Sequence, residues 1–207
     1  MPTFRDSSNK RFFYIHIPRT AGRFFSEMIV SNGFNQEYKE DIVTSHYHRE
    51  LYEKCLGVKD IPHITVIRNP VDRFFGSSFL LKRKYGENIN YILEDVDDCF
   101  MILDNFWVGN SLDGVLSVKP VKDMTRYFKP QLDYISSHTN IWKYENGFGN
   151  DFAYWMSDIL NIDFKINHVS YPKLTVNEND KIDRNDRIID NVIRYYEKDM
   201  EKFYAHV

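Results

Sequence analysis

Residues 13–24 read Phe13-Tyr14-Ile15-His16-Ile17-Pro18-Arg19-Thr20-Ala21-Gly22-Arg23-Phe24. The aromatic and β-branched residues from Arg11 to Ile17 predict a buried strand. Pro18 ends this strand because proline has no N–H to donate. The small residues at 20–22 predict a tight turn into a helix that stops near Gly33. Such a helix N-terminus suits a phosphate or sulfate, since its free N–H groups and its dipole favour an anion.

Arg19 adds a full positive charge to this turn. Many α/β proteins nevertheless contain a strand, turn and helix that bind nothing, so the stretch alone leaves a structural turn and an anion site equally open. The stretch does not contain the Walker A pattern G-x-x-x-x-G-K-[ST], which argues against a P-loop kinase.

The chain has 207 residues, of which 43% are hydrophobic, enough for one sizeable core. We therefore expect a polar N-terminal segment at 1–10 and a single domain at 11–207. The formal charge of -3 does not indicate a broadly basic surface for nucleic acid or a membrane, so any anion site has to depend on a local group of positive charges. We expect no nucleic-acid partner.

Cys55 and Cys99 are the only cysteines and do not form a C-x-x-C pair. This count disfavours a disulfide framework and a cysteine metal site, and it fits a reducing compartment. Residues 1–10 lack the apolar core of a signal peptide, and no stretch is long and apolar enough to span a bilayer. The sequence therefore predicts a cytoplasmic protein.

A second charged turn follows the apolar segment at 62–68, which predicts a central parallel strand. Pro70 suits the first turn of a helix that runs toward Tyr85, with Asn69 as its cap. Arg68 then lies at the carboxyl end of a strand, which is the ligand-binding edge of open α/β sheets. A charge placed there also calls for an anionic partner.

The remaining pattern completes an α/β fold. It predicts strands at 42–48 and 140–145, a helix at 151–160 and a long last helix at 186–203. The expected architecture is a single domain with a central, mainly parallel sheet flanked by helices.

The segments 16–22 and 67–74 together resemble the sulfotransferases that use 3′-phosphoadenosine 5′-phosphosulfate (PAPS). The resemblance is strongest to the carbohydrate-type branch, which includes the heparan and chondroitin O-sulfotransferases. Residues 130–135, 143–146 and 195–204 are similar to later segments of that family. The resemblance implies the sulfotransferase fold with its P-loop-like turn, and transfer of a sulfuryl group to a hydroxyl.

The family's motifs also imply a donor site. The first motif would bind the 5′-phosphosulfate, and the second would bind the 3′-phosphate through Arg68 and a helix serine, here Ser77. The reaction would leave adenosine 3′,5′-bisphosphate and would need no metal ion. The residues expected to bind the donor are Pro18, Arg19, Thr20, Ala21, Gly22, Arg23, Phe24, Arg68 and Ser77.

Three residues are candidates for catalysis. Arg19 would stabilise the charge that grows on the leaving phosphate oxygen. His46 is the first candidate for the base, since its pKa suits proton transfer and the heparan-type enzymes place a catalytic histidine between the two motifs. His48 is the second, because residues two apart share one face of a strand. Outside a family context, a lone histidine is more often structural.

The chain departs from the family at three places. Arg19 stands where lysine is usual, Arg23 and Phe24 replace hydroxyl residues, and Gly76 occupies the position of the family serine. These changes keep open a PAPS-binding protein of the same fold that has lost or altered catalysis. A P-loop nucleotide kinase is the weaker alternative. The acceptor is open among a sugar, a small metabolite, a lipid and a tyrosine, as is the oligomeric state.

Overall fold

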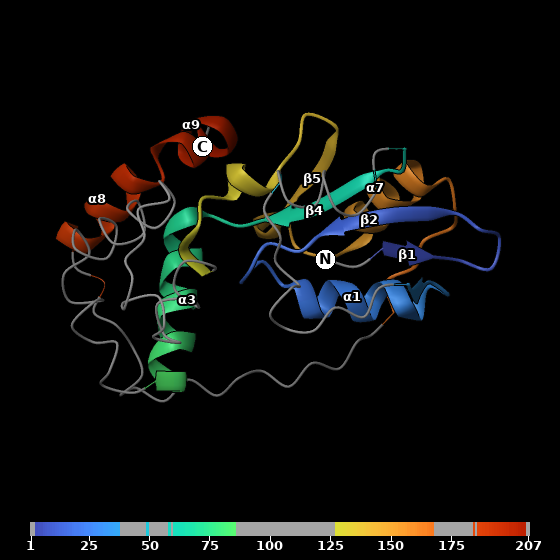
Figure 1. Ribbon diagram of the computed structural model, residues 1–207, viewed down its shortest axis with the longest axis horizontal. Helices are drawn as coiled ribbons and strands as arrows, with labels where there is room; N and C mark the ends of the chain where they lie inside the picture. The colour runs from blue at the N-terminus through green and yellow to red at the C-terminus, as the bar shows by residue number, and fades with distance from the viewer. Residues whose placement is uncertain are drawn as a thin grey trace, which may run out of the picture. The chain divides into compact units, whose positions relative to one another are not determined.

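The computed structural model describes residues 3–37, 49, 58, 60–85, 127–167, 184 and 186–205. The chain forms two compact units (Figure 1). The first comprises Met1–Arg68 with Gln131–Lys173 and contains the sheet. The second comprises Asn69–Pro130 with Leu174–Val207 and is helical in its described part. The predicted strand at 42–48 lies outside the described residues.

In its described residues, the first unit is built on a mixed five-stranded sheet in the order β3-β1-β2-β4-β5. Strand β2 pairs in parallel with β4, and β4 pairs in parallel with β5, whereas β1 runs antiparallel to both β2 and β3. The α/β class is therefore confirmed, but the sheet is mixed and not mainly parallel. The strands are β1 Thr3–Arg5, β2 Arg11–Ile15, β3 Asn35–Gln36, β4 His63–Ile67 and β5 Thr139–Lys143.

A tight hairpin explains the antiparallel part of the sheet. The Asp6 carboxylate accepts hydrogen bonds from the backbone N–H groups of Ser8 (2.9 Å) and Lys10 (2.8 Å). Asn9 adopts a left-handed backbone with φ 69°, which asparagine tolerates better than most residues. A connection this short can only reverse the chain, so β1 lies antiparallel to β2. Residues 1–10 thus supply a strand of the sheet.

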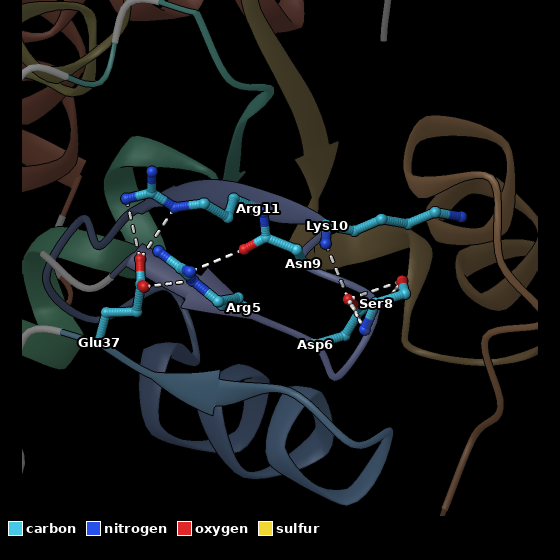
Figure 2. A network of polar contacts seen from close by, with 7 residues as sticks. All are labelled: Arg5, Asp6, Ser8, Asn9, Lys10, Arg11 and Glu37. Carbon is cyan, nitrogen blue, oxygen red and sulfur yellow. Dashed lines mark hydrogen bonds and ion pairs between the residues drawn. The ribbon is translucent and has the colours of Figure 1, made fainter.

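Figure 2 shows how the hairpin is joined to the chain after β3. Arg5 and Arg11 lie opposite each other on β1 and β2, and both form ion pairs with Glu37. Arg11 reaches Glu37 Oε2 from Nη2 at 2.9 Å and from Nε at 3.0 Å. One carboxylate therefore fixes three neighbouring chain segments.

The main core lies between one face of the sheet and two helices, α1 (Gly22–Ser31) and α7 (Asn150–Leu160). Tyr14 of β2 stacks on Phe25 of α1 at 4.1 Å between ring centroids, and Phe25 meets Phe152 of α7 edge to face. Aromatic pairs of this kind add to the large apolar area that each ring buries. Figure 1 shows α1 lying along β1 and β2. Helix α1 ends as predicted, with Gly33 at φ +86°.

The second unit packs α3 (Pro70–Tyr85) against α8 (Asp186–Tyr195), which is followed by α9 (Glu197–Tyr204). The predicted cap of α3 is confirmed, since Asn69 Oδ1 accepts the N–H of Val71 at 3.0 Å. The predicted single helix at 186–203 is wrong, because the chain breaks at Tyr196 (φ -98°, ψ 23°). The Tyr196 hydroxyl donates to the Phe128 carbonyl at 2.5 Å, which ties the break to a neighbouring segment.

Candidate functional site

The turn between β2 and α1 has an unusual backbone. Arg19 (φ 68°) and Ala21 (φ 66°) are both left-handed, with Thr20 between them. Side chains at positive φ are strained, and such strain is concentrated at functional turns. A left-handed residue in a tight turn can also direct neighbouring N–H groups toward a common point. The turn is therefore a candidate concavity for an anion.

The N-terminus of α1 follows directly from this turn. Ala21 is the N-cap and provides no side-chain hydrogen bond, and the first turn of α1 contains no acidic residue. The first N–H groups of a helix have no partner within it, and the helix dipole makes this end positive. No acidic side chain in the first turn of α1 offsets that charge.

His16 lies directly beneath the start of α1. A Cβ built on Gly22 would be 1.9 Å from His16 Nε2, so the imidazole occupies the space that any side chain at 22 would need. Burial, with a further contribution from the positive charge of Arg23, lowers the pKa of His16 to about 3. The imidazole is thus neutral at ordinary pH. The half-buried ring stacks on Tyr14, with 5.6 Å between the ring centroids.

Thr20 points inward from the turn. Its side chain is fully buried, and its hydroxyl donates to the Ile17 carbonyl at 2.8 Å. The hydroxyl therefore does not cap α1, and in this conformation its one proton is directed to the backbone. The neighbouring Arg19 is half-buried, Arg23 is exposed, and Pro18 is buried. Phe24 contacts Phe148 at 5.1 Å between centroids.

Arg68 is held at the end of β4 from both sides. The buried Gln131 side chain accepts the Arg68 N–H at 3.0 Å and donates to the Arg68 carbonyl at 2.8 Å. The guanidinium lies over the ring of Tyr144, 4.8 Å from its centroid. Neither contact is an ion pair, so the Arg68 charge is oriented by these contacts and is not neutralised by them.

The two arginines of the predicted donor site follow neighbouring parallel strands. Arg19 comes after β2 and Arg68 after β4, and the register pairs Ile15 with Thr65. Both residues therefore leave the sheet at the same edge, together with Tyr144 after β5. In open α/β sheets this carboxyl edge is where ligands bind.

Ser77 belongs to the second unit and is fully buried in α3. Its hydroxyl donates to the Arg73 carbonyl one turn back, at 2.9 Å, and lies 3.3 Å from the Tyr127 carbonyl. This bonding is typical of a serine inside a helix. The predicted contact of Ser77 with a 3′-phosphate stays a prediction, and the two candidate bases, His46 and His48, lie outside the described residues.

Two residues of this edge were not singled out from the sequence. Tyr144 lies near the end of the strand predicted at 140–145 and directly follows β5, so the strand-end rule that selects Arg68 also selects it. No sequence pattern indicates Gln131. Its side chain forms hydrogen bonds with the backbone of Arg68, 63 positions away, and only the three-dimensional structure shows such a contact.

No protein-family model, curated protein or solved structure was found to match this chain. Within the described ranges, no helix combines the length and the apolar character needed to cross a membrane. The same ranges contain no group of three histidine, cysteine, aspartate or glutamate residues arranged to hold a metal ion.

Proposed function

We propose that this chain is a sulfotransferase that moves the sulfuryl group of PAPS to an acceptor hydroxyl. The observation that carries the proposal is the pair of arginines, Arg19 and Arg68, at the carboxyl ends of adjacent parallel strands. One of them is part of a strained turn at a helix N-terminus, and the other is oriented without an ion pair from its described contacts. PAPS carries phosphate groups at the two ends of one ribose, so two separate cationic anchors fit it.

The transfer is an in-line displacement at sulfur. The acceptor oxygen forms a bond to sulfur while the bond from sulfur to the 5′-phosphate oxygen breaks. The electron pair of that bond stays on the phosphate, and adenosine 3′,5′-bisphosphate leaves. Arg19 and the N–H groups at the start of α1 would stabilise the charge on the leaving oxygen more strongly as it grows.

Arg68 would bind the 3′-phosphate. Its guanidinium lies over the ring of Tyr144, 4.8 Å from the ring centroid, and the planar fork of an arginine can bind two phosphate oxygens at once. Gln131 fixes the backbone from which this side chain extends, so the anchor is pre-oriented. Pre-orientation lowers the entropy lost on binding.

The acceptor proton would pass to a histidine, with His46 as the first candidate and His48 as the second. Neither is placed by the described residues, so these roles rest on the family resemblance alone. His16 is not a candidate for this base, because its low pKa makes the neutral imidazole a poor proton acceptor.

A PAPS-binding protein without turnover is the second candidate function. It is favoured by the Thr20 hydroxyl, which is directed to Ile17 and not to the turn's outer side, and by the loss of two family hydroxyls at Arg23 and Phe24. Such a protein would bind the bisphosphate product but would transfer no sulfate.

One experiment separates these functions. The full chain is incubated with PAPS labelled in its sulfate and with a panel of sugar, metabolite, lipid and tyrosine acceptors, and titration calorimetry measures binding of adenosine 3′,5′-bisphosphate. The sulfotransferase binds the bisphosphate and labels an acceptor, and Arg19→Ala and Arg68→Ala lose both properties. Arg11→Ala is the matched control, because Arg11 begins β2 at the opposite edge. Tight binding without transfer supports the second function, and no binding contradicts both.

A further inference from the structure

The chain contains the sequence Asn-Gly-Phe twice, at 32–34 and at 146–148, and the two copies have similar backbones. Gly33 (φ +86°) and Gly147 (φ +72°) are both left-handed, and the N–H of each donates at 3.0 Å to the carbonyl three residues before it. Apart from adjoining residues, nothing described lies within 4 Å of a Cβ built on either glycine. The two copies therefore form a matched pair, and the comparison falls on their asparagine side chains.

The two asparagine side chains differ in how they are held. The Asn32 amide group donates to the carbonyls of Met28 (2.9 Å) and Lys165 (2.8 Å), and its oxygen accepts the N–H of Lys165 at 2.8 Å. Asn146 is exposed, and its side chain forms no hydrogen bond within the described residues. It ends a 3₁₀ turn of three residues, after which glycine occurs twice. Such a short turn beside glycines deforms easily, whereas the Asn32 amide is fixed.

An asparagine that precedes a glycine can react with its own backbone. The glycine nitrogen loses its proton and forms a bond to the side-chain carbonyl carbon of the asparagine. The bond from that carbon to the amide nitrogen breaks, and ammonia leaves with a proton. Water then opens the five-membered succinimide at one of its two carbonyls and leaves aspartate or isoaspartate. Glycine favours the reaction because it has no Cβ to obstruct the approach and its backbone turns freely.

We propose that Asn146 is a site of spontaneous deamidation in the folded protein and that Asn32 is protected from the same reaction. At Asn146, the attack requires the release of one hydrogen bond, from the Gly147 N–H to the Tyr144 carbonyl. At Asn32, the equivalent backbone bond and three side-chain hydrogen bonds have to be released. These three additional bonds should make Asn32 about a hundredfold slower.

The reaction adds one negative charge near the carboxyl edge of the sheet. Position 146 lies two residues after Tyr144, whose ring lies beneath the Arg68 guanidinium. A carboxylate in this turn opposes the attraction between Arg68 and an anion. This consequence rests on the proposed function, whereas the modification itself does not. It predicts that the affinity for adenosine 3′,5′-bisphosphate falls about twofold as the protein ages, as for an exposed charge.

The test follows both asparagines in the full chain, incubated in mildly alkaline buffer made from water labelled in its oxygen. Mass spectrometry of the digested protein measures the loss of ammonia and the gain of labelled oxygen at each position. Asn146 should be modified well before Asn32 in the folded chain. In concentrated urea the two should react at similar rates, because the same two residues follow each of them. Asn146→Gln is the matched control, since its longer side chain disfavours ring closure, and position 146 should then stay unmodified.

The rates decide the proposal. Equal rates in the folded chain, or a faster reaction at Asn32, would overturn it. So would a difference that persists in urea, because it would then come from the sequence and not from the structure. An Asn146 that reacts in urea and not in the folded chain also contradicts it.

Calorimetry on aged wild type and aged Asn146→Gln tests the added charge. Lower affinity in aged wild type alone supports its effect on the ligand, and equal affinity removes that effect. If fresh protein does not bind the nucleotide, the proposed function fails and the mass data still judge the modification.

Discussion

The imidazole of His16 fills the space above the α-carbon of Gly22, with Nε2 only 1.9 Å from where a Cβ would stand. The glycine that opens α1 is therefore required by a protein side chain, whether or not a ligand approaches it. This contact reverses the usual effect of replacing a helical glycine.

Gly22→Ala should destabilise the protein. In most helices, replacing glycine by alanine raises the free energy of unfolding by about 0.5–1 kcal/mol. Here the added methyl group overlaps the His16 ring and should lower that free energy by about 1–3 kcal/mol. Urea denaturation measures the change. The double variant His16→Ala with Gly22→Ala should recover most of the loss. Gly149→Ala is the control, because nothing lies within 4 Å of a Cβ there, and it should be nearly neutral.

The stability of the protein should fall in acid partly because of His16. Its folded pKa of about 3 is below the unfolded value near 6.5, so between these values the unfolded chain binds more protons. The contribution of His16 is therefore fully present above pH 6.5 and is lost as the pH falls toward 3, by at most about 1.4 kcal/mol per pH unit. His16→Gln should flatten this part of the pH profile measured by urea denaturation.

Asn69→Ala should weaken α3. The side chain accepts the N–H of Val71 at 3.0 Å, and removing such a cap costs about 1 kcal/mol. Asn69→Ser keeps an acceptor and should restore most of the stability in the same denaturation experiment. Equal stability of the alanine and serine variants would show that the cap contributes nothing.

Gln131→Ala should lower the free energy of unfolding by about 2 kcal/mol, more than an average surface substitution does. The change leaves the N–H and the carbonyl of Arg68 without their side-chain partner. Hydrogen exchange of the Arg68 amide should accelerate in parallel. Asn140→Ala is the comparison, since it removes one half-buried bond to the His63 carbonyl and should cost less. A wild-type exchange rate at Arg68 would contradict the assigned role.

Tyr144 should matter for the nucleotide and not for the fold. Tyr144→Ala removes the ring beneath the Arg68 guanidinium, and we expect adenosine 3′,5′-bisphosphate to bind about fivefold more weakly, as for the loss of about 1 kcal/mol of cation–π contact. Tyr144→Phe keeps the ring and should bind within twofold of wild type. Calorimetry compares the three proteins. Equal binding by the alanine variant would remove Tyr144 from the site.

Much of the local structure could be predicted from the sequence. The apolar runs of β2 and β4, the cap at Asn69 and the end of α1 near Gly33 each follow from a local rule, and each is confirmed. The rule that ligands bind at strand ends also selected Arg68, and the structure brings it to the same edge as Arg19.

The rest depends on contacts between distant residues. The hairpin before β2 depends on Asp6 and Asn9, residue types that favour a tight reversal, but the polar composition of residues 1–10 does not by itself indicate a strand there. The break between α8 and α9 at Tyr196 could not be predicted from the sequence, because the Tyr196 hydroxyl bonds to the carbonyl of Phe128, 68 positions away. The pairing of Gln131 with Arg68 likewise spans 63 positions and follows no local pattern.

Among the strands of the described residues, β3 is the outermost on one side of the sheet, and it is only two residues long, Asn35–Gln36. The ion pairs from Glu37 to Arg5 and Arg11 begin directly after it, so the margin of the sheet is both short and charged. Such an edge offers almost no unpaired backbone N–H and C=O groups with which a strand from another molecule could pair. At this border the protein should resist aggregation, even at high concentration.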